Sequence, residues 1–222
     1  MAERAALDIG ELRDQSDFVG GLWTPEGGVR RPAARKGREG SREALRLAID
    51  AVRAEFESAD LRPNRRMCEL LVAGEDHRIA LHPGVDPLAL CRAAWRTYGR
   101  GRVEGGSTVA MQFVRVLTGR FENSWRRKMR EMALAVVATR YAHRSELASL
   151  YLLVGYYGWR MNGFGQACRR LGIDPKTCSL RDSAMLIARL KYPQPRDCSV
   201  TRWAQIVGRG EYLVGRLESG GQ

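Results

Sequence analysis

The sequence predicts an all-α protein, and three observations carry that prediction. Apolar residues recur three and four positions apart along most of the chain, which is the period of a helix with one buried face. Serine, threonine or aspartate stands directly before several of these segments, and glycine or proline follows several of them, as at helix ends. No segment alternates apolar and polar residues as a half-buried strand does, and no repeat of roughly 20–50 residues is present.

The N-terminal part of the chain divides at about residue 40. Residues 1–40 combine glycine and proline residues with a basic run, which predicts a flexible basic N-terminal arm. Residues 41–222 are predicted to fold as a single domain, because their number is that of an ordinary domain. The first helix is expected over 41–56, with Ser41 as its N-cap.

Caps and stop signals place the remaining helices. Asp86, followed by proline, predicts the start of a helix that Gly99 ends. Ser145 predicts the start of another helix, and Ser179 with Asp182 resembles a capping box. The predicted helices after the first cover residues 64–73, 88–98, 109–117, 124–140, 146–154, 163–170, 184–190 and 201–217.

The charge balance is the unusual feature of the composition. Thirty-seven lysine and arginine residues face 25 acidic residues, which gives a formal net charge of +12. Such a chain favours a polyanionic partner, namely nucleic acid, an anionic membrane or a phosphate-bearing substrate. Nucleic acid is not expected, because the arginines are spread along the chain and no zinc-finger, RRM or basic-zipper pattern is present.

The sequence shows no segment apolar enough for a transmembrane helix, and its first residues do not form a signal peptide. Five cysteines, with no pair spaced as CxxC, are expected to be reduced thiols rather than zinc ligands.

The first cluster of candidate functional residues lies between two predicted helices. It comprises Glu75, Asp76, His82 and Asp86. Two interpretations are open. The cluster binds a metal or supplies a general base, or Asp86 caps a helix and Glu75 is solvated.

A glycine-rich turn forms the second cluster. Gly105, Gly106, Ser107 and Thr108 run directly into a predicted helix. Backbone N–H groups at a helix N-terminus form an anion site, although the same residues also make an ordinary helix start.

The third cluster lies on the predicted helix 124–140. Arg127, Lys128 and Glu131 share one helix face, because they are three and four positions apart. They form either a surface ion pair or a site that presents cations to a phosphate.

In this order the three clusters resemble the motifs of glycosyltransferase family 51, the peptidoglycan glycosyltransferases that polymerise lipid II. The family motifs are E-D-x-x-F-x-x-H-x-G-x-D, G-G-S-T-x-x-Q-Q and R-K-x-x-E, and a weaker fourth block includes Tyr151. The resemblance covers 73–195 and implies a mostly helical, lysozyme-like, bilobed glycosyltransferase domain. The matching residues are Glu75, Asp76, His82, Gly84 and Asp86, then Gly105, Gly106, Ser107, Thr108 and Gln112, then Arg127, Lys128 and Glu131.

The resemblance also implies roles for these residues. Glu75 would be the general base for inverting transfer from a lipid-pyrophosphate donor to a sugar 4-hydroxyl. Glu131 would be the second glutamate, which either holds a divalent cation (Mg or Mn) or orients a basic residue; no organic cofactor is implied. The residues expected to bind the pyrophosphate are Lys128, Arg127, Arg115, Gln112, Ser107, Thr108, Gly105 and Gly106.

Several positions depart from the family pattern. Ala110 and Met111 replace a threonine and a glutamine, which is expected to remove polar groups from the cleft wall. Asn123, Ser149 and Leu153 depart as well. These changes motivate an alternative, a catalytically weakened relative that binds lipid-linked cell-wall precursor or assists another cell-wall enzyme. A lysozyme-like lytic enzyme is the second alternative, since one glutamate can act as a general acid.

The family implies partners and a location. The partners are lipid II or undecaprenyl-pyrophosphate-linked glycan, an anionic membrane surface, and other cell-wall synthesis proteins. Members act at the periplasmic or outer face of the cytoplasmic membrane and usually carry a transmembrane helix, which this sequence does not show, so a cytoplasmic or truncated chain remains the alternative. The chain also shows no penicillin-binding transpeptidase domain and resembles the monofunctional type. Segment 88–102 is either an amphipathic basic segment that rests on a bilayer or an ordinary helix with a solvated face.

Overall fold

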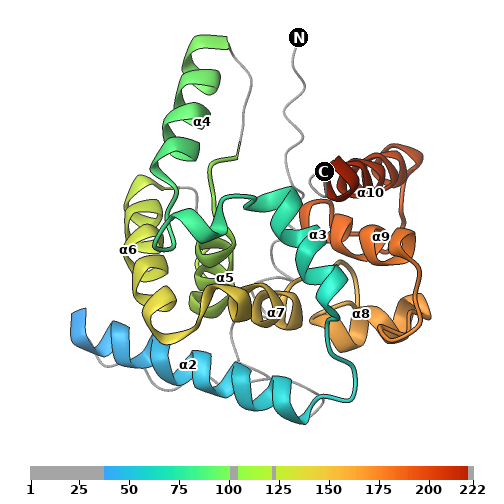
Figure 1. The fold of residues 1–222 in the computed structure, drawn as a ribbon, viewed down its shortest axis with the longest axis horizontal. Coiled ribbons are helices and arrows are strands. Elements are labelled where there is room, and N and C mark those ends of the chain that lie inside the picture. Colours follow the sequence, from blue (N-terminus) through green and yellow to red (C-terminus); the bar gives the residue numbers. More distant parts are fainter. Residues whose placement is uncertain (1–37, 101–104, 122–123, 220–222) are drawn as a thin grey trace.

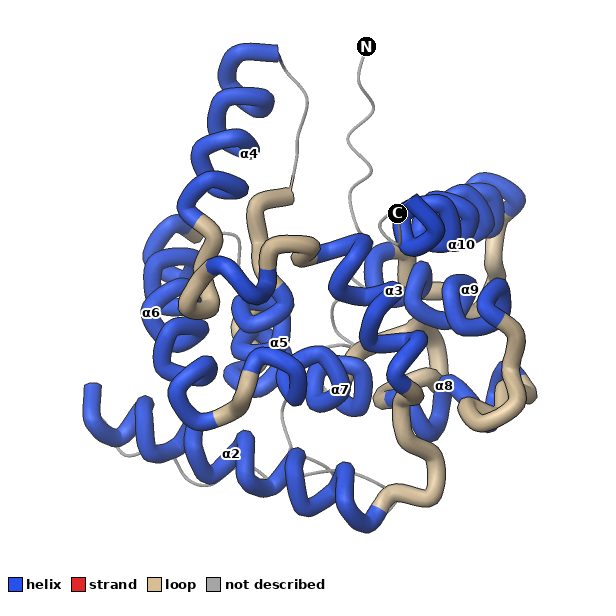
Figure 2. The backbone as a smooth tube through the Cα atoms, in the orientation of Figure 1, coloured by secondary structure: helices blue, strands red, loops and turns tan. Residues whose placement is uncertain are grey.

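The computed structural model describes residues 38–100, 105–121 and 124–219, and within these ranges it contains helices and no strand (Figures 1 and 2). The all-α prediction is confirmed. The elements are α2 (Arg38–Ser58), α3 (Arg65–Glu75), the 3₁₀ turn η1 (Ile79–Leu81), α4 (Pro87–Arg100), α5 (Val109–Thr118), α6 (Trp125–Tyr141), α7 (Arg144–Val154), α8 (Phe164–Leu171), α9 (Leu180–Lys191) and α10 (Val200–Ser219).

Helix α5 is the centre of one group of helices. It packs against α6, α7 and α2, and α2 runs along the lower edge of this group in Figure 1. A helix that is apolar on most of its surface must be covered on several sides, and α5 fits that description. Its buried residues are Val109, Ala110, Met111, Phe113, Val114 and Leu117.

A second group consists of α3, α9 and α10. Helix α3 packs against both other members and also against α7, so it joins the two groups (Figure 1). This position matters for function, because the C-terminal end of α3 carries Glu75.

Helix α4 extends away from the other helices (Figure 2). It presents Leu88 and Trp95, which are 61% and 60% exposed, together with the exposed side chains of Arg92 and Arg96. The helical part of 88–102 therefore carries both exposed apolar and exposed basic side chains, and its contact with a bilayer stays a prediction. Residues 101–104 lie outside the described residues.

Several predicted helix ends are confirmed by their cap contacts. The side chain of Ser124 accepts a hydrogen bond from the backbone of Arg127, and Ser179 with Asp182 forms a complete capping box. Asp86 accepts from the backbone N–H of Leu88 at 2.9 Å at the start of α4.

Other predicted ends are wrong. Helix α2 begins before Ser41, and α4 continues past Gly99. A serine or glycine is only a weak signal of a helix end. Both residues are tolerated inside an exposed helix, where they lower helix stability by about 1 kcal/mol or less. Helix α7 begins after His143, whose ring accepts from the backbone of Ser145, so His143 is the N-cap. Most of the predicted arm, residues 1–37, lies outside the described residues.

No helix in the described ranges is both long and apolar enough to cross a membrane. The five cysteines are free in the structure. Burial raises the pKa of Cys68 to about 11 and that of Cys168 to about 12, so neither thiol is a nucleophile near neutral pH.

Candidate active site

Glu75 is the last residue of α3, and its side chain is 21% exposed. Its Oε2 accepts a hydrogen bond from the side-chain amide of Gln112 at 3.0 Å. Its Oε1 accepts from the guanidinium of Arg209, which also donates to the carbonyl of Gly74. The carboxylate is therefore held between α5 and α10, while part of the side chain remains accessible to solvent.

Tyr151 fixes the orientation of Gln112. The phenol of Tyr151 donates to Gln112 Oε1 at 2.9 Å, which leaves the amide nitrogen of Gln112 to face Glu75. Burial raises the pKa of Tyr151, and the negative charge of Glu75 raises it further, so the phenol stays protonated and remains a donor. The sequence motif predicts Gln112 as a site residue, and Tyr151 supports it.

Arg115 links this carboxylate to the second glutamate. It lies on α5 one turn beyond Gln112, and its Nε and Nη2 donate to the two oxygens of Glu131 at 3.0 and 2.9 Å. One face of α5 thus directs an amide towards Glu75 and a guanidinium towards Glu131. The two glutamates, which are far apart in the sequence, therefore both contact this face of α5.

Glu131 is buried among cations, with 4% of its surface exposed. Besides Arg115, it contacts Arg127 and Lys128, both on its own helix α6. Burial acts to raise the pKa of Glu131, but the hydrogen bond and charge of Arg115, with the charges of Lys128 and Arg127, outweigh burial and leave the pKa lowered. Glu131 is therefore an ionised counter-ion that holds three basic side chains in place.

Ser107 lies beside these cations. Its Oγ accepts from Lys128 Nζ at 2.7 Å and from Arg115 Nη2 at 3.4 Å. Burial lowers the pKa of Lys128, and the charges of Arg115 and Arg127 add to this effect, although Glu131 opposes it. Three cations around one carboxylate leave a surplus of positive charge, next to the N-terminus of α5. Such a surplus suits a phosphate-bearing ligand.

The other first-motif residues build the loop between α3 and α4. Asp76 accepts from His82 Nε2 at 2.8 Å and from the backbone N–H of Val109 at 3.0 Å, so it ties the loop to the start of α5. Asp86 caps α4 and forms an ion pair of 3.0 Å with Arg78. Asp76, His82 and Asp86 are buried. These three residues therefore stabilise the loop beside the site and do not line the site itself.

Thr108 and Gly84 join the first two motifs. Thr108 is the N-cap of α5, and its hydroxyl donates to the carbonyl of Gly84 at 2.6 Å. Gly84 has a φ of +93°, and a Cβ there would lie 2.5 Å from the carbonyl oxygen of Ala135, so only glycine fits. Since Thr108 is buried, Ser107 is the hydroxyl of the motif that reaches the cations.

The two glycines of the second motif differ in their surroundings. A Cβ on Gly106 would lie 3.1 Å from the Cβ of Ala93 on α4, so Gly106 allows the turn to approach that helix closely. A Cβ on Gly105 would meet no atom within 4 Å. Gly105 is exposed and has no packing requirement of this kind.

The surroundings of Glu131 do not fit a divalent cation. A Mg or Mn site needs several oxygen ligands, whereas Glu131 faces the nitrogen atoms of three basic side chains. No group of three or more histidine, cysteine, aspartate or glutamate side chains in the described ranges is arranged to hold a metal. The geometry at Glu131 instead matches the other predicted role, orientation of basic residues.

Three of the departures from the family pattern lie in the core rather than on a cleft wall. Met111 is 0% exposed and Ala110 is 1% exposed, and both pack inside the central group of helices. The expectation that they remove polar groups from the cleft wall is therefore wrong, because on α5 these positions point into the protein. Leu153 is also buried, and Ser149 donates to the carbonyl of Glu146 within its own helix. Asn123 lies outside the described residues.

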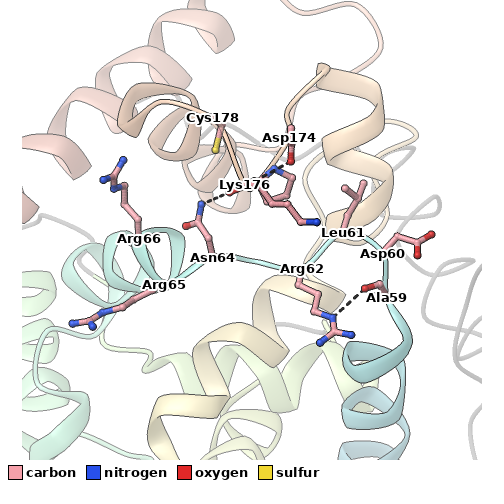
Figure 3. A pocket seen from close by; sticks show the side chains of 11 residues that line it. Ala59, Asp60, Leu61, Arg62, Asn64, Arg65, Arg66, Asp174, Lys176 and Cys178 are labelled. Carbon is pink, nitrogen blue, oxygen red and sulfur yellow. Dashed lines mark hydrogen bonds between the residues drawn. The ribbon is translucent and has the colours of Figure 1, made fainter.

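A cavity of about 680 Å³ lies at the other end of α3, between the α2–α3 and α8–α9 loops (Figure 3). Its lining includes Arg66 and Lys176 but neither glutamate of the candidate site. The presence of a large cavity therefore does not locate the candidate active site in this protein.

Arg209 is the site residue that sequence reasoning does not find. It lies on α10, 134 positions from the glutamate that it contacts. No spacing rule links an arginine in a C-terminal helix to an acid at the end of an early one, so only the packing of α3 against α10 shows the pair.

Comparison with known proteins agrees with the motifs. Residues 51–217 match the family described as Transglycosylase. Penicillin-binding protein 1C of Escherichia coli is 35% identical over 143 residues, which are 63% of this chain and 18% of that protein. Penicillin-binding protein 1A of Vibrio cholerae is 30% identical over 131 residues, 58% of this chain and 16% of that protein.

A third relative, penicillin-binding protein 1A of Aquifex aeolicus, is 36% identical over 124 residues, 55% of this chain and 17% of that protein. The chain therefore spans less than a fifth of the length of these relatives. The family match, in contrast, includes every helix of the candidate site. The chain belongs to the transglycosylase family, the glycosyltransferase family 51 that its motifs resemble.

Proposed function

We propose that this protein is a peptidoglycan glycosyltransferase that polymerises lipid II into glycan strands. The observation that carries the proposal is the arrangement around α5. Glu75, whose side chain is 21% exposed, contacts Gln112. One turn further along the same face of α5, Arg115 contacts Glu131, which gathers three basic side chains around it.

Glu75 is the proposed general base. In the proposed reaction its carboxylate takes the proton of the acceptor 4-hydroxyl, whose oxygen forms a bond to the anomeric carbon of the donor with inversion. Gln112 and Arg209 hold the carboxylate from both sides, so it is oriented before substrate binds. Preorganisation of this kind lowers the barrier without a conformational change during the reaction.

The basic cluster is the proposed site for the leaving group. As the bond between the anomeric carbon and the phosphate oxygen breaks, negative charge develops on the pyrophosphate. Lys128, Arg115 and Arg127 stabilise that charge, and Glu131 holds them in position beforehand. A hydrolase acting on a neutral glycan needs no such cluster, so the arrangement favours transfer over the lysozyme-like alternative.

The catalytically weakened alternative loses its main support. It was motivated by the departures at Ala110, Met111, Ser149 and Leu153, and three of these, Ala110, Met111 and Leu153, are core residues. Both candidate glutamates and the basic cluster are present.

A membrane surface is the proposed location of the reaction, since the lipid donor resides there. Helix α4 supports this proposal with exposed apolar side chains beside exposed arginines. By family resemblance the surface is the periplasmic or outer face of the cytoplasmic membrane. The polymer product and other cell-wall synthesis proteins are the proposed further partners.

The test is polymerisation of lipid II by the wild-type protein and the Glu75→Gln variant. We expect the variant to lose at least about a hundredfold in rate, because an amide cannot accept the proton. Product is measured as glycan chain length on a gel.

Glu69→Gln is the matched control, since it makes the same change on the same helix at a side chain that is 43% exposed. We expect it to retain the wild-type rate. Polymerisation by Glu75→Gln at the control rate would overturn the role of Glu75, and no polymer from the folded wild-type protein would overturn the proposed function.

A further inference from the structure

Three arginines surround one tryptophan on a part of the surface that the proposed reaction does not use. The guanidinium carbons of Arg160, Arg170 and Arg196 lie 4.7, 4.6 and 5.4 Å from the ring centre of Trp159. We name these four residues the Trp159 cluster. Arg170 lies on α8, whereas the other members lie in the α7–α8 and α9–α10 loops.

The charges of the Trp159 cluster are not balanced by acids. No ion pair joins any of its arginines to a carboxylate in the described ranges, and all three side chains are exposed. Asp174, which follows Arg170 by four positions in the sequence, instead accepts from the backbone of Lys176 and the hydroxyl of Thr177. Contact of an exposed guanidinium with an aromatic ring contributes only about 0.5–1 kcal/mol, so mutual repulsion of the three charges is offset only in part.

Three cations so close together favour a multivalent anion. Since each lies within 5.4 Å of one ring centre, any two are separated by no more than about a Debye length, ~10 Å at 0.1 M salt. Stacking on the ring leaves the in-plane N–H groups of guanidinium free to bind carboxylate or phosphate in a bidentate manner. A ligand with several acidic groups therefore gains from all three arginines together.

Backbone contacts hold Trp159, the ring at the centre of the cluster, in place before any ligand binds. The N–H of Trp159 donates to the carbonyl of Gln194 at 2.8 Å, and the N–H of Gln194 donates to the carbonyl of Tyr157 at 3.1 Å. These bonds join the α7–α8 loop to the α9–α10 loop. The buried Arg189 donates to the side-chain oxygen of Gln194 at 2.9 Å and adds a further positive charge. A preformed site loses less conformational entropy on binding.

The location of the Trp159 cluster, away from α4, argues against a membrane as its partner (Figure 1). The exposed apolar side chains Leu88 and Trp95 lie on α4, and Figure 1 shows α8 on the far side of the helical body from α4. A flat bilayer in contact with α4 would leave Arg170 in the aqueous phase. Nucleic acid is disfavoured as well, because the ring on which a base would stack is already covered by guanidinium groups.

We propose that the Trp159 cluster is a docking site for an acidic peptide segment of a partner protein, recognised through several carboxylates. Clusters of arginine are a recurrent solution for acidic motifs. The site lies apart from Glu75 and Glu131, so binding does not depend on the proposed transfer reaction.

The test is binding of a fluorescein-labelled hexaglutamate peptide to the full chain, followed by anisotropy at about 0.15 M salt, where long-range attraction is screened. The Arg160→Gln/Arg170→Gln/Arg196→Gln variant is expected to weaken the Kd by at least about tenfold. Arg42→Gln/Arg181→Gln/Arg216→Gln, at three other exposed arginines, makes the same change in net charge and is expected to keep the Kd within about twofold.

A second variant protects the test against a failure to fold. Arg160 has a φ of 54°, a left-handed conformation that favours glycine, so Arg160→Gly should fold at least as well as the wild type and bind about two- to threefold more weakly. Glu75→Gln should bind as the wild type does, which separates this proposal from the proposed function.

Three results would overturn the proposal. The first is no binding of the peptide by the wild type. The second is equal weakening in the two triple variants, which would mean a response to net charge alone. The third is tighter binding of anionic vesicles or duplex DNA that is lost in the Arg160/Arg170/Arg196 variant, which would identify a membrane or nucleic-acid site.

Discussion

Glu131 shows how one side chain can determine the geometry of a whole cluster. It is the acidic partner of Arg115, Arg127 and Lys128, and it is almost fully buried. If it were neutral, its charge would no longer offset the mutual repulsion of these three cations. Its proposed contribution to catalysis is therefore indirect, through the placement of groups that touch the phosphates.

Replacement of Glu131 by glutamine should lower the free energy of unfolding by about 2–4 kcal/mol near pH 7. The value is below that for a fully buried ion pair, because the basic partners are partly exposed. Urea denaturation measures the loss. Glu57→Gln, at an exposed acid of α2, is the control and should change stability by less than about 0.5 kcal/mol.

The difference between wild type and Glu131→Gln should depend on pH. The pKa of Glu131 is lowered in the folded state, so its contribution is complete above the ordinary value of 4.5 and is lost as the pH falls through the folded-state pKa. We therefore expect the difference to narrow below about pH 4. A difference that stays constant from neutral to acid pH would show that Glu131 is not a stabilising anion.

Arg209 is a positioning residue for Glu75. Arg209→Met should lower kcat by about ten- to a hundredfold with little change in KM, because Glu75 loses the partner that fixes one oxygen. Arg209→Lys, which retains the charge, should recover part of the rate. The control is Arg216→Met on the exposed surface of the same helix, and an equal loss in both methionine variants would contradict the assignment.

Helix α5 determines which parts of the site can be read from sequence. Its cap Thr108, its apolar run and the motif residue Gln112 are all local signals, and each is where the motif predicts. The direction of each side chain is not a local signal. The sequence does not say that Met111 faces the core while Gln112, its neighbour, faces Glu75, because that depends on how α6 and α7 cover α5.

Contacts between helices also explain why the arrangement of the site residues relative to one another cannot be predicted from the sequence. Glu75 and Glu131 are identified by their motifs, but their common dependence on α5 requires the fold. The contact of Arg209 with Glu75 requires α10 to pack against α3, and no pattern within either helix specifies its partner. Helix existence was predictable from periodicity, whereas the partners of each helix were not.

The restoration of the family residue at position 111 tests the orientation of α5. Met111→Gln should lower the free energy of unfolding by about 1–3 kcal/mol, because a buried amide would lack hydrogen-bond partners, and it should not raise polymerisation. Met129→Gln, at a side chain that is 54% exposed, should be nearly neutral in stability. A Met111→Gln protein that is more active and equally stable would show that the side chain at position 111 faces the cleft rather than the core.

At the scale of the whole molecule, the net charge of +12 is distributed among distinct surfaces. Part of it surrounds Ser107, part forms the Trp159 cluster, and part lies on α4 beside exposed apolar side chains. Each surface suits a different anion: a pyrophosphate, an acidic peptide and a bilayer. The sequence predicts that the protein binds polyanions. The fold groups the basic side chains into separate sites with different neighbouring residues.

The α4 surface should bind anionic vesicles through both charge and apolar contact. Leu88→Ser/Trp95→Ser should weaken the partition onto phosphatidylglycerol vesicles by about tenfold or more, since burial of each large apolar side chain contributes about 1.5–3 kcal/mol when complete. Binding of the wild type should fall as salt rises from about 0.05 to 0.5 M, because salt screens the attraction between the arginines and the anionic lipids.

The control is Val200→Ser/Trp203→Ser, which removes one aliphatic and one aromatic exposed side chain from α10. Co-sedimentation measures the partition, and equal losses in the two double variants would mean that α4 is not the surface that meets the membrane.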